Sequence, residues 1–396
     1  MLDLAAYGER LWDDPYAVFD DLRRSGDVHP VQFPDGSQAW LILGHAEVRR
    51  ALTDPTLSKN WQRATGRTGP EILGRNMLTC DPPDHTRLRR LISRTFSARR
   101  IATMAASVQA TVDTVLGGVE ARGTIELVTG LAVPVALGTV VDLLGVPFLE
   151  RGRFRRWTNE IMTSTDPAVE ERLTYELVGY LDALVEHKRT EPGDDLLSEM
   201  IRAVDEDGGR LSHDELRGTA FLLLLAGHET TVNLIANGVH ALLTHRAQLA
   251  ALRADWTLVD AVIDEVLRWE GPLTYTTTRF TTDPYRVGAV TIPGDGSRVL
   301  LAIGSASRDA ALFPEPHRFD IHRPPSAHFA FGYGIHHCLG APLARLEGRI
   351  VLRALFTRFS DLALVSPTGS WRRSLTSRAM TELTVRWTPP ATAGAR

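Results

Sequence analysis

A cysteine near the carboxyl end of the chain, Cys338, has the surroundings expected of a metal-binding thiolate. It closes the run FGYGIHHC, and residues 343–359 after it have the pattern of an amphipathic helix. A thiol just before a helix meets the positive end of the helix dipole and free N–H groups, which lower its pKa. Three nearby glycines let the backbone approach a flat group closely, namely Gly332, Gly334 and Gly340. The segment therefore favours a thiolate ligand over a buried, inert cysteine.

A second polar segment, AGHETT at residues 226–231, interrupts an apolar helix expected over residues 212–245. Ser212 and Glu215 predict a capping box at its start, and residues 220–226 are apolar all round, so the helix should cross the interior. Gly227 and Thr230 share a face, and the threonine hydroxyl can take a carbonyl of the preceding turn and open the helical ladder. Glu229 beside them offers a carboxylate for proton transfer. A helix kink with a solvated glutamate is the alternative interpretation.

Two other kinds of site fit these residues poorly. His228 and Glu229 begin like a zinc-protease helix, but the second histidine would fall at Val232. Gly332 and Gly334 begin like a dinucleotide-binding loop, but the third glycine position holds His337 and no βαβ pattern precedes it. Since no nicotinamide or flavin domain is visible, any electrons must come from another protein.

The pattern Phe-Gly-x-Gly-x-His-x-Cys-x-Gly at residues 331–340 resembles the haem-binding signature of the cytochrome P-450 superfamily, and residues 226–231 resemble its oxygen-binding segment. The resemblance extends in order over nearly the whole chain. It implies haem b, with Cys338 as the axial ligand of the iron. It also implies that Glu229 and Thr230 deliver protons to oxygen. The residues it places against the haem are Ala226, Gly227, Phe331, Gly332 and Gly340.

Haem propionates need cations around them, and the resemblance implies four candidates. His85 and Arg89 are one turn apart on a helix that opens at residues 81–84. Arg279 follows a strand-like run, and His336 lies two residues before the cysteine. Glu265 and Arg268, three apart on a helix over residues 259–269, resemble the family's Glu-x-x-Arg pair, with Arg318 expected as the third member of a structural trio.

The substrate site is described only by its expected walls. Leu222 and Leu223 share a helix face with Thr230, so this wall should be apolar with one polar notch. Residues 60–73, which include Trp61, have the composition of a mobile lid. Two further walls are expected, one with Leu273 and Thr274 in residues 273–277 and one with Met380 in a late turn. A long lid favours a bulky substrate.

The fold class expected is mainly α with small β-sheets, because helical periodicity dominates residues 84–270 while strand-like runs are short. Strands are predicted near residues 39–43, 287–292, 298–303 and 381–387. The resemblance implies the cytochrome P-450 fold, with a long central helix over a buried haem. No linker or repeat divides the chain, which favours one domain over residues 1–396 with a frayed tail at residues 389–396.

Composition excludes several classes of protein. With 44 basic and 48 acidic side chains the net charge is −4, so nothing attracts the whole chain to nucleic acid or anionic membranes. Two cysteines, Cys80 and Cys338, are too few for a disulfide framework. The start of the chain has no secretion signal, so a cytoplasmic protein is expected. Residues 130–148 are nearly all apolar, but Asp142, Pro134 and Pro147 favour a buried helix over a membrane span.

Together these features predict a monomeric haem monooxygenase that hydroxylates or epoxidises a bulky, largely apolar secondary metabolite such as a polyketide or peptide. It would use O2 and electrons from ferredoxin and ferredoxin reductase. Six arginines between residues 87 and 100 form either a solvated helix face or a docking site for an acidic ferredoxin, to which Arg345 and Arg349 could contribute. The alternatives are a haem-thiolate enzyme that couples rings or desaturates, and a haem-based gas sensor.

Overall fold

The computed structural model describes residues 1–67, 74–147, 150, 152–153, 156–157, 160, 167–206, 211–325, 327–366 and 369–389. The chain forms two compact units, of which the first comprises Met1–Gly66, Ala105–Val135 and Thr230–Arg396. The second comprises Arg67–Met104 and Ala136–Glu229. The expectation of one domain over residues 1–396 stays a prediction. Of the expected frayed tail, residues 390–396 lie outside the described residues.

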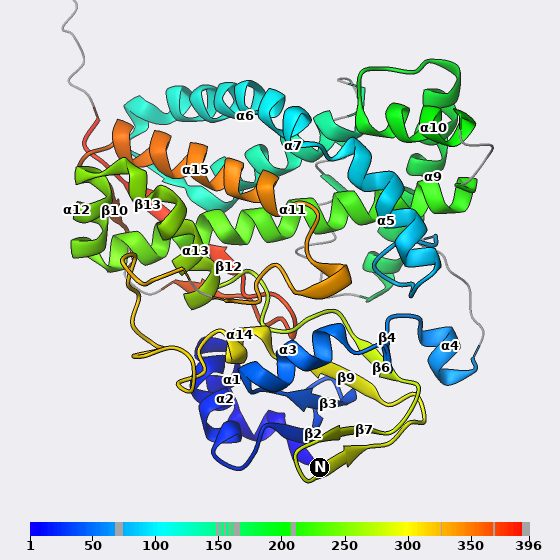
Figure 1. Cartoon of the computed structure of the whole chain (residues 1–396). Coiled ribbons are helices and arrows are strands. Elements are labelled where there is room, and N and C mark those ends of the chain that lie inside the picture. Colours follow the sequence, from blue (N-terminus) through cyan, green and yellow to red (C-terminus); the bar gives the residue numbers. More distant parts are fainter. Residues whose placement is uncertain are drawn as a thin grey trace, which may run out of the picture. The chain divides into compact units, whose positions relative to one another are not determined.

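Helices dominate the described chain (Figure 1). The α-helices are α1 (Arg10–Asp13), α2 (Pro15–Arg23), α3 (His45–Thr53), α4 (Trp61–Thr65), α5 (Asp84–Thr95), α6 (Ala98–Val119), α7 (Val133–Leu144), α9 (Pro167–Thr190), α10 (Leu196–Glu206), α11 (His213–Thr244), α12 (Arg246–Ala254), α13 (Val259–Trp269), α14 (Ile303–Ala306) and α15 (Ala341–Arg358). Short 3-10 helices are η1 (Leu4–Tyr7), η2 (Glu120–Arg122), η5 (Trp256–Leu258) and η6 (Gly334–His336), and η3 (Val128–Ala132) is a turn of π-helix.

The strands form four small sheets, all in the first unit. The largest has the order β1-β2-β3-β9-β6-β4, in which β3 and β9 are parallel. The others are β10-β13-β5, β11-β12 and the hairpin β7-β8. The strands are β1 (Leu2–Asp3), β2 (Val28–Gln32), β3 (Gln38–Ile42), β4 (Leu57–Ser58), β5 (Thr124–Glu126), β6 (Arg279–Thr281), β7 (Tyr285–Val287), β8 (Val290–Ile292), β9 (Arg298–Leu301), β10 (Ala363–Leu364), β11 (Ser370–Trp371), β12 (Met380–Glu382) and β13 (Thr384–Arg386).

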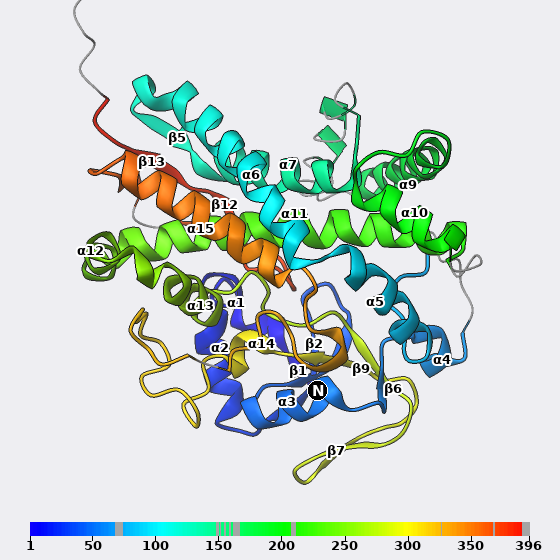
Figure 2. The same ribbon diagram turned by 45° about the horizontal axis from the view of Figure 1, so that its top comes forward.

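Three helices of the first unit pack together beside the sheets (Figure 2). Gly348 of α15 lies against Ile263 of α13 and Leu234 of α11, with ordinary van der Waals spacing for a side chain added at the glycine. The small residue therefore lets α15 approach both helices. This packing matters for the site because the segment with Cys338 leads directly into α15.

The predicted capping box of α11 is confirmed in the second unit. The Ser212 N–H donates to Glu215 Oε2 at 2.9 Å, and the Glu215 N–H donates to the Ser212 hydroxyl at 3.1 Å. The helix is apolar enough to cross a membrane by length and composition, as is no other helix of its length among the described residues, but 67% of its apolar window is buried. Burial of that kind is typical of a core helix.

Some sequence expectations about elements were wrong. The single strand expected near residues 287–292 is the hairpin β7-β8, because Gly288 has φ +58° and turns the chain. The strand expected over residues 298–303 stops at Leu301, and α14 starts at Ile303. Residues 381–387 contain parts of two strands, β12 and β13. Across residues 226–231, α11 continues as an α-helix, so the expected interruption of its pattern is not seen.

Candidate functional site

The segment before α15 holds Cys338 in a tight, hydrogen-bonded loop. The Cys338 N–H donates to the Phe331 carbonyl at 2.8 Å, and the Gly332 N–H donates to the Phe329 carbonyl at 2.8 Å. Cys338 is exposed, and a Cβ added at Gly340, the N-cap of α15, would lie 3.8 Å from its sulfur. The thiol therefore lies beside the N-terminus of α15, where the helix dipole favours a thiolate.

Two glycines of this loop have a backbone that other residues rarely adopt. Gly332 has φ +68° and Gly334 has φ +75°. At Gly334 a side chain would also meet a neighbour, because its Cβ would lie 2.9 Å from Thr53 Cγ2 at the end of α3. At Gly332 the nearest atom would be 3.6 Å away. Both conformation and packing thus require glycine at Gly334, whereas conformation alone requires it at Gly332.

A stripe of incompletely buried residues runs along the middle of α11, a helix that is otherwise mostly buried. Its members follow 3–4 spacing: Leu223, Gly227 and Thr230 are half-buried and Ala226 is exposed. Leu224 and His228, on other sides of the same turns, are 2% and 3% exposed. Leu222, expected on the stripe, is buried instead. The stripe is apolar and small, and it ends in a hydroxyl, as the sequence predicted for a wall beside oxygen.

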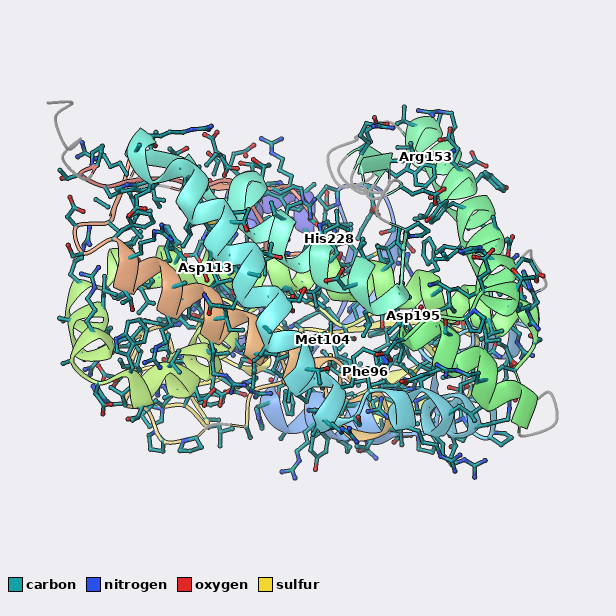
Figure 3. The ribbon with its side chains drawn as sticks, turned by 90° about the horizontal axis from the view of Figure 1, so that it is seen from above. Phe96, Met104, Asp113, Arg153, Asp195 and His228 are labelled. Atoms are coloured by element: carbon teal, nitrogen blue, oxygen red, sulfur yellow. The ribbon has the colours of Figure 1, made fainter. Side chains whose placement is uncertain are left out.

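Gly227 and His228 each have a second feature in the second unit. A Cβ at Gly227 would lie 2.9 Å from Val140 Cγ2 of α7, so the missing side chain allows the two helices to approach. His228 is marked on α11 in Figure 3. Its Nε2 is buried with no hydrogen-bond partner, and burial lowers the pKa of its imidazole to about 4. The histidine is therefore neutral near neutral pH.

A buried carboxylate that the sequence analysis missed connects α11 to α15. Glu347 is 2% exposed, and the Thr231 hydroxyl lies 3.5 Å from its Oε2. The signal was present in the sequence, because Glu347 occupies an apolar stripe between Leu343 and Val351 at four-residue spacing. This contact and the packing at Gly348 hold the helix after the cysteine loop against the part of α11 that follows Thr230.

Behind the loop, Glu265 and Arg268 form the expected buried pair. Arg268 donates to both carboxylate oxygens of Glu265, at 2.7 and 2.8 Å, and to three backbone carbonyls. The third member was predicted wrongly. Arg323 Nε lies 3.4 Å from Glu265, whereas the side chain of Arg318 is 56% exposed and pairs with Glu315. Only the Arg318 carbonyl meets Arg268, because the turn at Glu315, with φ +47°, directs the Arg318 guanidinium outwards.

The four cations expected at the propionates differ in their surroundings. In the first unit, Arg279 is 5% exposed and donates to the carbonyls of Leu57 and Leu52, at 3.1 and 3.2 Å, while His336 is half-buried in η6. In the second unit, His85 is 2% exposed on α5 and Arg89 is half-buried one turn later. Burial and the Arg89 charge lower the pKa of His85. An anion beside this pair would reverse the repulsion between them.

Backbone pairing joins two of the expected substrate walls within the first unit. Leu273 forms a β-bridge with Ser377, and the Thr274 N–H donates to the Thr376 carbonyl at 2.8 Å. Leu273 is half-buried, whereas Thr274 and Met380 are buried at 5% and 4% exposed. Trp61 is half-buried at the start of α4, which Asn60 caps, and residues 68–73 of the expected lid lie outside the described residues.

A buried ionic cluster behind these walls was not anticipated. Glu270 accepts from Arg378 at 2.6 Å and lies 3.5 Å from Arg308. The Arg308 guanidinium lies 3.5 Å from the ring centroid of Tyr16, and burial raises the pKa of that tyrosine. Nothing in the spacing of these residues signals the cluster, because its members come from distant parts of the chain.

The arginine run of residues 87–100 is not a uniform solvated face. In the second unit, Arg87 pairs with Glu215, and Arg100 lies 2.6 Å from Glu199. Arg90, Arg94 and Arg99 are exposed. In the first unit, Arg345 and Arg349 pair with Asp264 and Asp260, each at 2.8 Å. The first and last arginines of the run, and both arginines of α15, therefore have carboxylate partners.

The donor set suits a haem. An exposed thiol at a helix N-terminus supplies one soft ligand, and the glycines of its loop leave room for a flat ring. A stripe of small and apolar residues on a core helix supplies an uncovered surface, and buried cations supply charge for propionates. No cluster of three or more His, Cys, Asp or Glu side chains suited to a metal occurs in the described ranges.

Comparisons with known proteins agree with this chemistry. Residues 150–369 match the family model described as Cytochrome P450. The chain is 45% identical to cytochrome P450 monooxygenase PikC of Streptomyces venezuelae, covering 100% of this chain and 96% of that one. It is 43% identical to 6-deoxyerythronolide B hydroxylase of Saccharopolyspora erythraea, covering 94% and 96%. The solved structure of the P450 monooxygenase TamI bound to tirandamycin C is similar with a TM-score of 0.90 and 36% identity, covering 98% and 100%.

Proposed function

Since the chain belongs to the cytochrome P450 family and is a haem-dependent monooxygenase, we propose that it inserts one oxygen atom from O2 into a bulky, largely apolar secondary metabolite. The observation that carries the proposal is the exposed thiol of Cys338 in its glycine loop, in a chain whose core helix α11 keeps a stripe of small and apolar residues uncovered. Both features are what a haem-thiolate enzyme needs.

We assign the haem contacts to the residues named from the sequence. Cys338 would hold the iron, and Phe331, Gly332 and Gly340 would lie against the ring. A bound haem supplies the oxidising chemistry that no side chain offers. Five charged, small or polar residues complete the proposed set: His85, Arg89 and Arg279 with His336 at the propionates, and Ala226 with Gly227 at the ring face. Haem b is the form we propose.

Proton delivery is assigned to neighbouring residues on α11. Glu229 is half-buried, so its carboxylate can exchange protons with water while remaining next to the core. Thr230 is half-buried at the end of the stripe, where its hydroxyl can hold a water and pass a proton on. The neutral His228 on the buried side of the helix cannot supply a proton near neutral pH.

The substrate class is argued from the relatives and from the walls. One relative is a hydroxylase of 6-deoxyerythronolide B, and one similar structure holds tirandamycin C. We therefore propose a polyketide or a comparably bulky molecule, bound against Leu223, Leu273 and Trp61, which are half-buried. The buried side chains of Leu222, Thr274 and Met380 would shape this site from behind, although the sequence analysis proposed them as contacts.

Electrons are proposed to come from ferredoxin and its reductase. Arg90, Arg94 and Arg99 are exposed, and the first two lie one turn apart on α5, so they present positive charge to an acidic partner. Arg345 and Arg349 are less suited, because aspartates already neutralise them. Replacing Arg90 and Arg94 by glutamate should slow reduction by ferredoxin at low salt while leaving reduction by dithionite unchanged; equal reduction by ferredoxin would contradict this docking face. A monomeric, cytoplasmic protein is proposed with it.

Substrate-dependent turnover tests the function. A panel of macrolides, cyclic peptides, terpenes and fatty acids is titrated against the holoenzyme, and the haem absorbance reports displacement of water. Hits are then turned over with ferredoxin, its reductase and O2. A product heavier by one oxygen atom supports the proposal. A product lighter by two hydrogens would assign desaturation or coupling instead, and gas binding with no turnover of any compound would leave the sensor alternative.

Thr230→Ala and Glu229→Gln test the proton route in the same assay. Thr230→Ala should keep haem and substrate binding but divert reducing equivalents to peroxide or water, and Glu229→Gln should slow turnover. Full coupling of electrons to product in Thr230→Ala would remove this residue from the route.

A further inference from the structure

The chain has only two lysines, and both are buried. Lys59 and Lys188 are the lysines among 44 basic side chains, and they are 6% and 7% exposed. Every other basic side chain is an arginine. Buried ammonium groups are costly unless polar atoms surround them. The two positions that keep lysine in an arginine-rich chain are therefore positions where the shape of the cation matters.

Lys59 holds a single stretch of backbone. Its Nζ donates to the carbonyls of Thr277 and Thr278, both at 3.0 Å, and also to the Thr277 hydroxyl. Three oxygens around one nitrogen match the three N–H donors of an ammonium. A planar guanidinium spreads its donors over a wide fork and cannot direct three of them to one point. This geometry accounts for a lysine at this position.

The residues that Lys59 joins are the ones placed around the substrate. On its own side, Lys59 lies between β4 and Trp61, and Asn60 caps α4. On the other side, Thr277 ends the wall that starts at Leu273. The remaining support of this wall comes from elsewhere in the first unit, because the Thr276 N–H donates to the Leu301 carbonyl at 2.9 Å.

A second set of bonds runs in the same direction. The Arg279 guanidinium donates to the carbonyls of Leu57 and Leu52, so the segment around β4 both gives and receives hydrogen bonds across this junction. Leu57 and Ser58 of β4 also pair with Thr281 and Phe280 of β6. The junction continues from the strand pair to Lys59, and Lys59 is its last bond before the α4 segment.

We propose that Lys59 is a positioning residue that sets the distance between Trp61 and the wall from Leu273 to Thr277, and so determines which bulky ligands the site accepts. The proposal rests on the function proposed above and adds a residue that determines specificity. Removing the ammonium leaves three buried oxygens without their donor, so the wall and the α4 segment should separate or collapse. Ligands that reach both sides should then bind more weakly, because the site is no longer preorganised.

Azoles test this without a known substrate. Imidazole and clotrimazole both bind haem iron through a ring nitrogen, but only clotrimazole is large enough to reach surrounding walls. Both are titrated against the wild-type holoenzyme, Lys59→Met and Thr277→Val, with binding read from the haem spectrum. Thr277→Val removes the hydroxyl acceptor but keeps both carbonyls. Lys188→Met is the matched control, because Lys188 is the other buried lysine and pairs at 2.6 Å with Asp195, just before α10 (Figure 3).

In Lys59→Met the Kd of clotrimazole should rise about tenfold and that of imidazole by less than about twofold. Thr277→Val should show a smaller change in the same direction, and it carries the test if Lys59→Met does not retain haem. Lys188→Met should unfold at lower urea but keep the wild-type ratio of the two Kd values. An unchanged ratio in Lys59→Met, or in Thr277→Val where that variant carries the test, would overturn the proposal. Absence of a haem-thiolate spectrum in the wild type would instead refute the proposed function.

Discussion

Replacing Gly334 by alanine separates two costs that the cysteine loop imposes on its glycines. Gly332 and Gly334 both have positive φ, so alanine at either should cost about 1–2 kcal/mol of backbone strain. Only at Gly334 does the new Cβ meet Thr53 Cγ2, at 2.9 Å, well inside the ~3.5–4.0 Å at which carbon atoms attract. Overpacking of this kind costs a further ~1–3 kcal/mol.

The structure also supplies the change that should relieve the clash. Thr53→Ser removes Cγ2 but keeps the hydroxyl that donates to the Arg50 carbonyl at 3.1 Å. The next atom to the Gly334 Cβ is then the Leu52 carbonyl oxygen at 3.4 Å, an ordinary contact. The double variant with Gly334→Ala should therefore lose only the strain cost, close to Gly332→Ala. Thr53 is exposed, so Thr53→Ser alone should cost less than about 1 kcal/mol.

Urea unfolding of the four variants and the wild-type holoenzyme measures these costs. The reduced carbon monoxide spectrum shows in parallel whether the loop still presents its thiolate. Gly334→Ala should be the least stable and show the largest loss of the thiolate band. If Thr53→Ser failed to improve Gly334→Ala in stability or spectrum, the contact between α3 and the loop would not be the cause, and the packing argument would be wrong.

Three further predictions concern buried and exposed groups. Burial lowers the pKa of His228 to about 4, so between pH 6.5 and 4 the unfolded chain binds a proton that the folded chain does not; stability should fall by up to about 3 kcal/mol as pH falls through that window, and His228→Gln should lose that much less in urea unfolding at each pH. Equal pH dependence of the two proteins would contradict this. Burial also raises the pKa of the Cys80 thiol to about 12 while Cys338 is exposed, so after haem removal a thiol reagent should modify one cysteine rapidly in the wild type and none in Cys338→Ala; rapid modification of Cys80 would show that its burial is wrong. Arg323→Ala should lower the free energy of unfolding by about 2–3 kcal/mol and Arg318→Ala by less than about 1 kcal/mol, and the reverse order in urea unfolding would restore the sequence-based trio.

Local signals in the sequence were enough to predict the elements that carry the chemistry. The capping box at Ser212 and Glu215 depends on residues three apart, and the predicted helix over residues 259–269 has the bounds of α13. The resemblance at residues 331–340 placed Cys338 before a helix, as found. Each of these depends on neighbours along the chain, which is the information that spacing contains.

Features that depend on distant residues could not be predicted in the same way. Strands of two or three residues, such as β4, are defined by their partners and have no periodicity of their own. Arg318 and Arg323 are equally plausible partners for Glu265 until the turn at Glu315 is known. The cluster around Glu270 and the clamp at Lys59 join segments more than 90 residues apart, and only tertiary structure brings them together.

Carbon monoxide binding to the reduced protein tests the central assignment most directly. The wild type and Cys80→Ser should both show the red-shifted Soret band of thiolate-bound haem. Cys338→Ala should lack it, even where haem is retained, because Cys80 is buried and its pKa is raised to about 12, so it cannot replace the ligand. Retention of that band in Cys338→Ala would show that the thiolate ligand is another residue and that the account of the site is wrong.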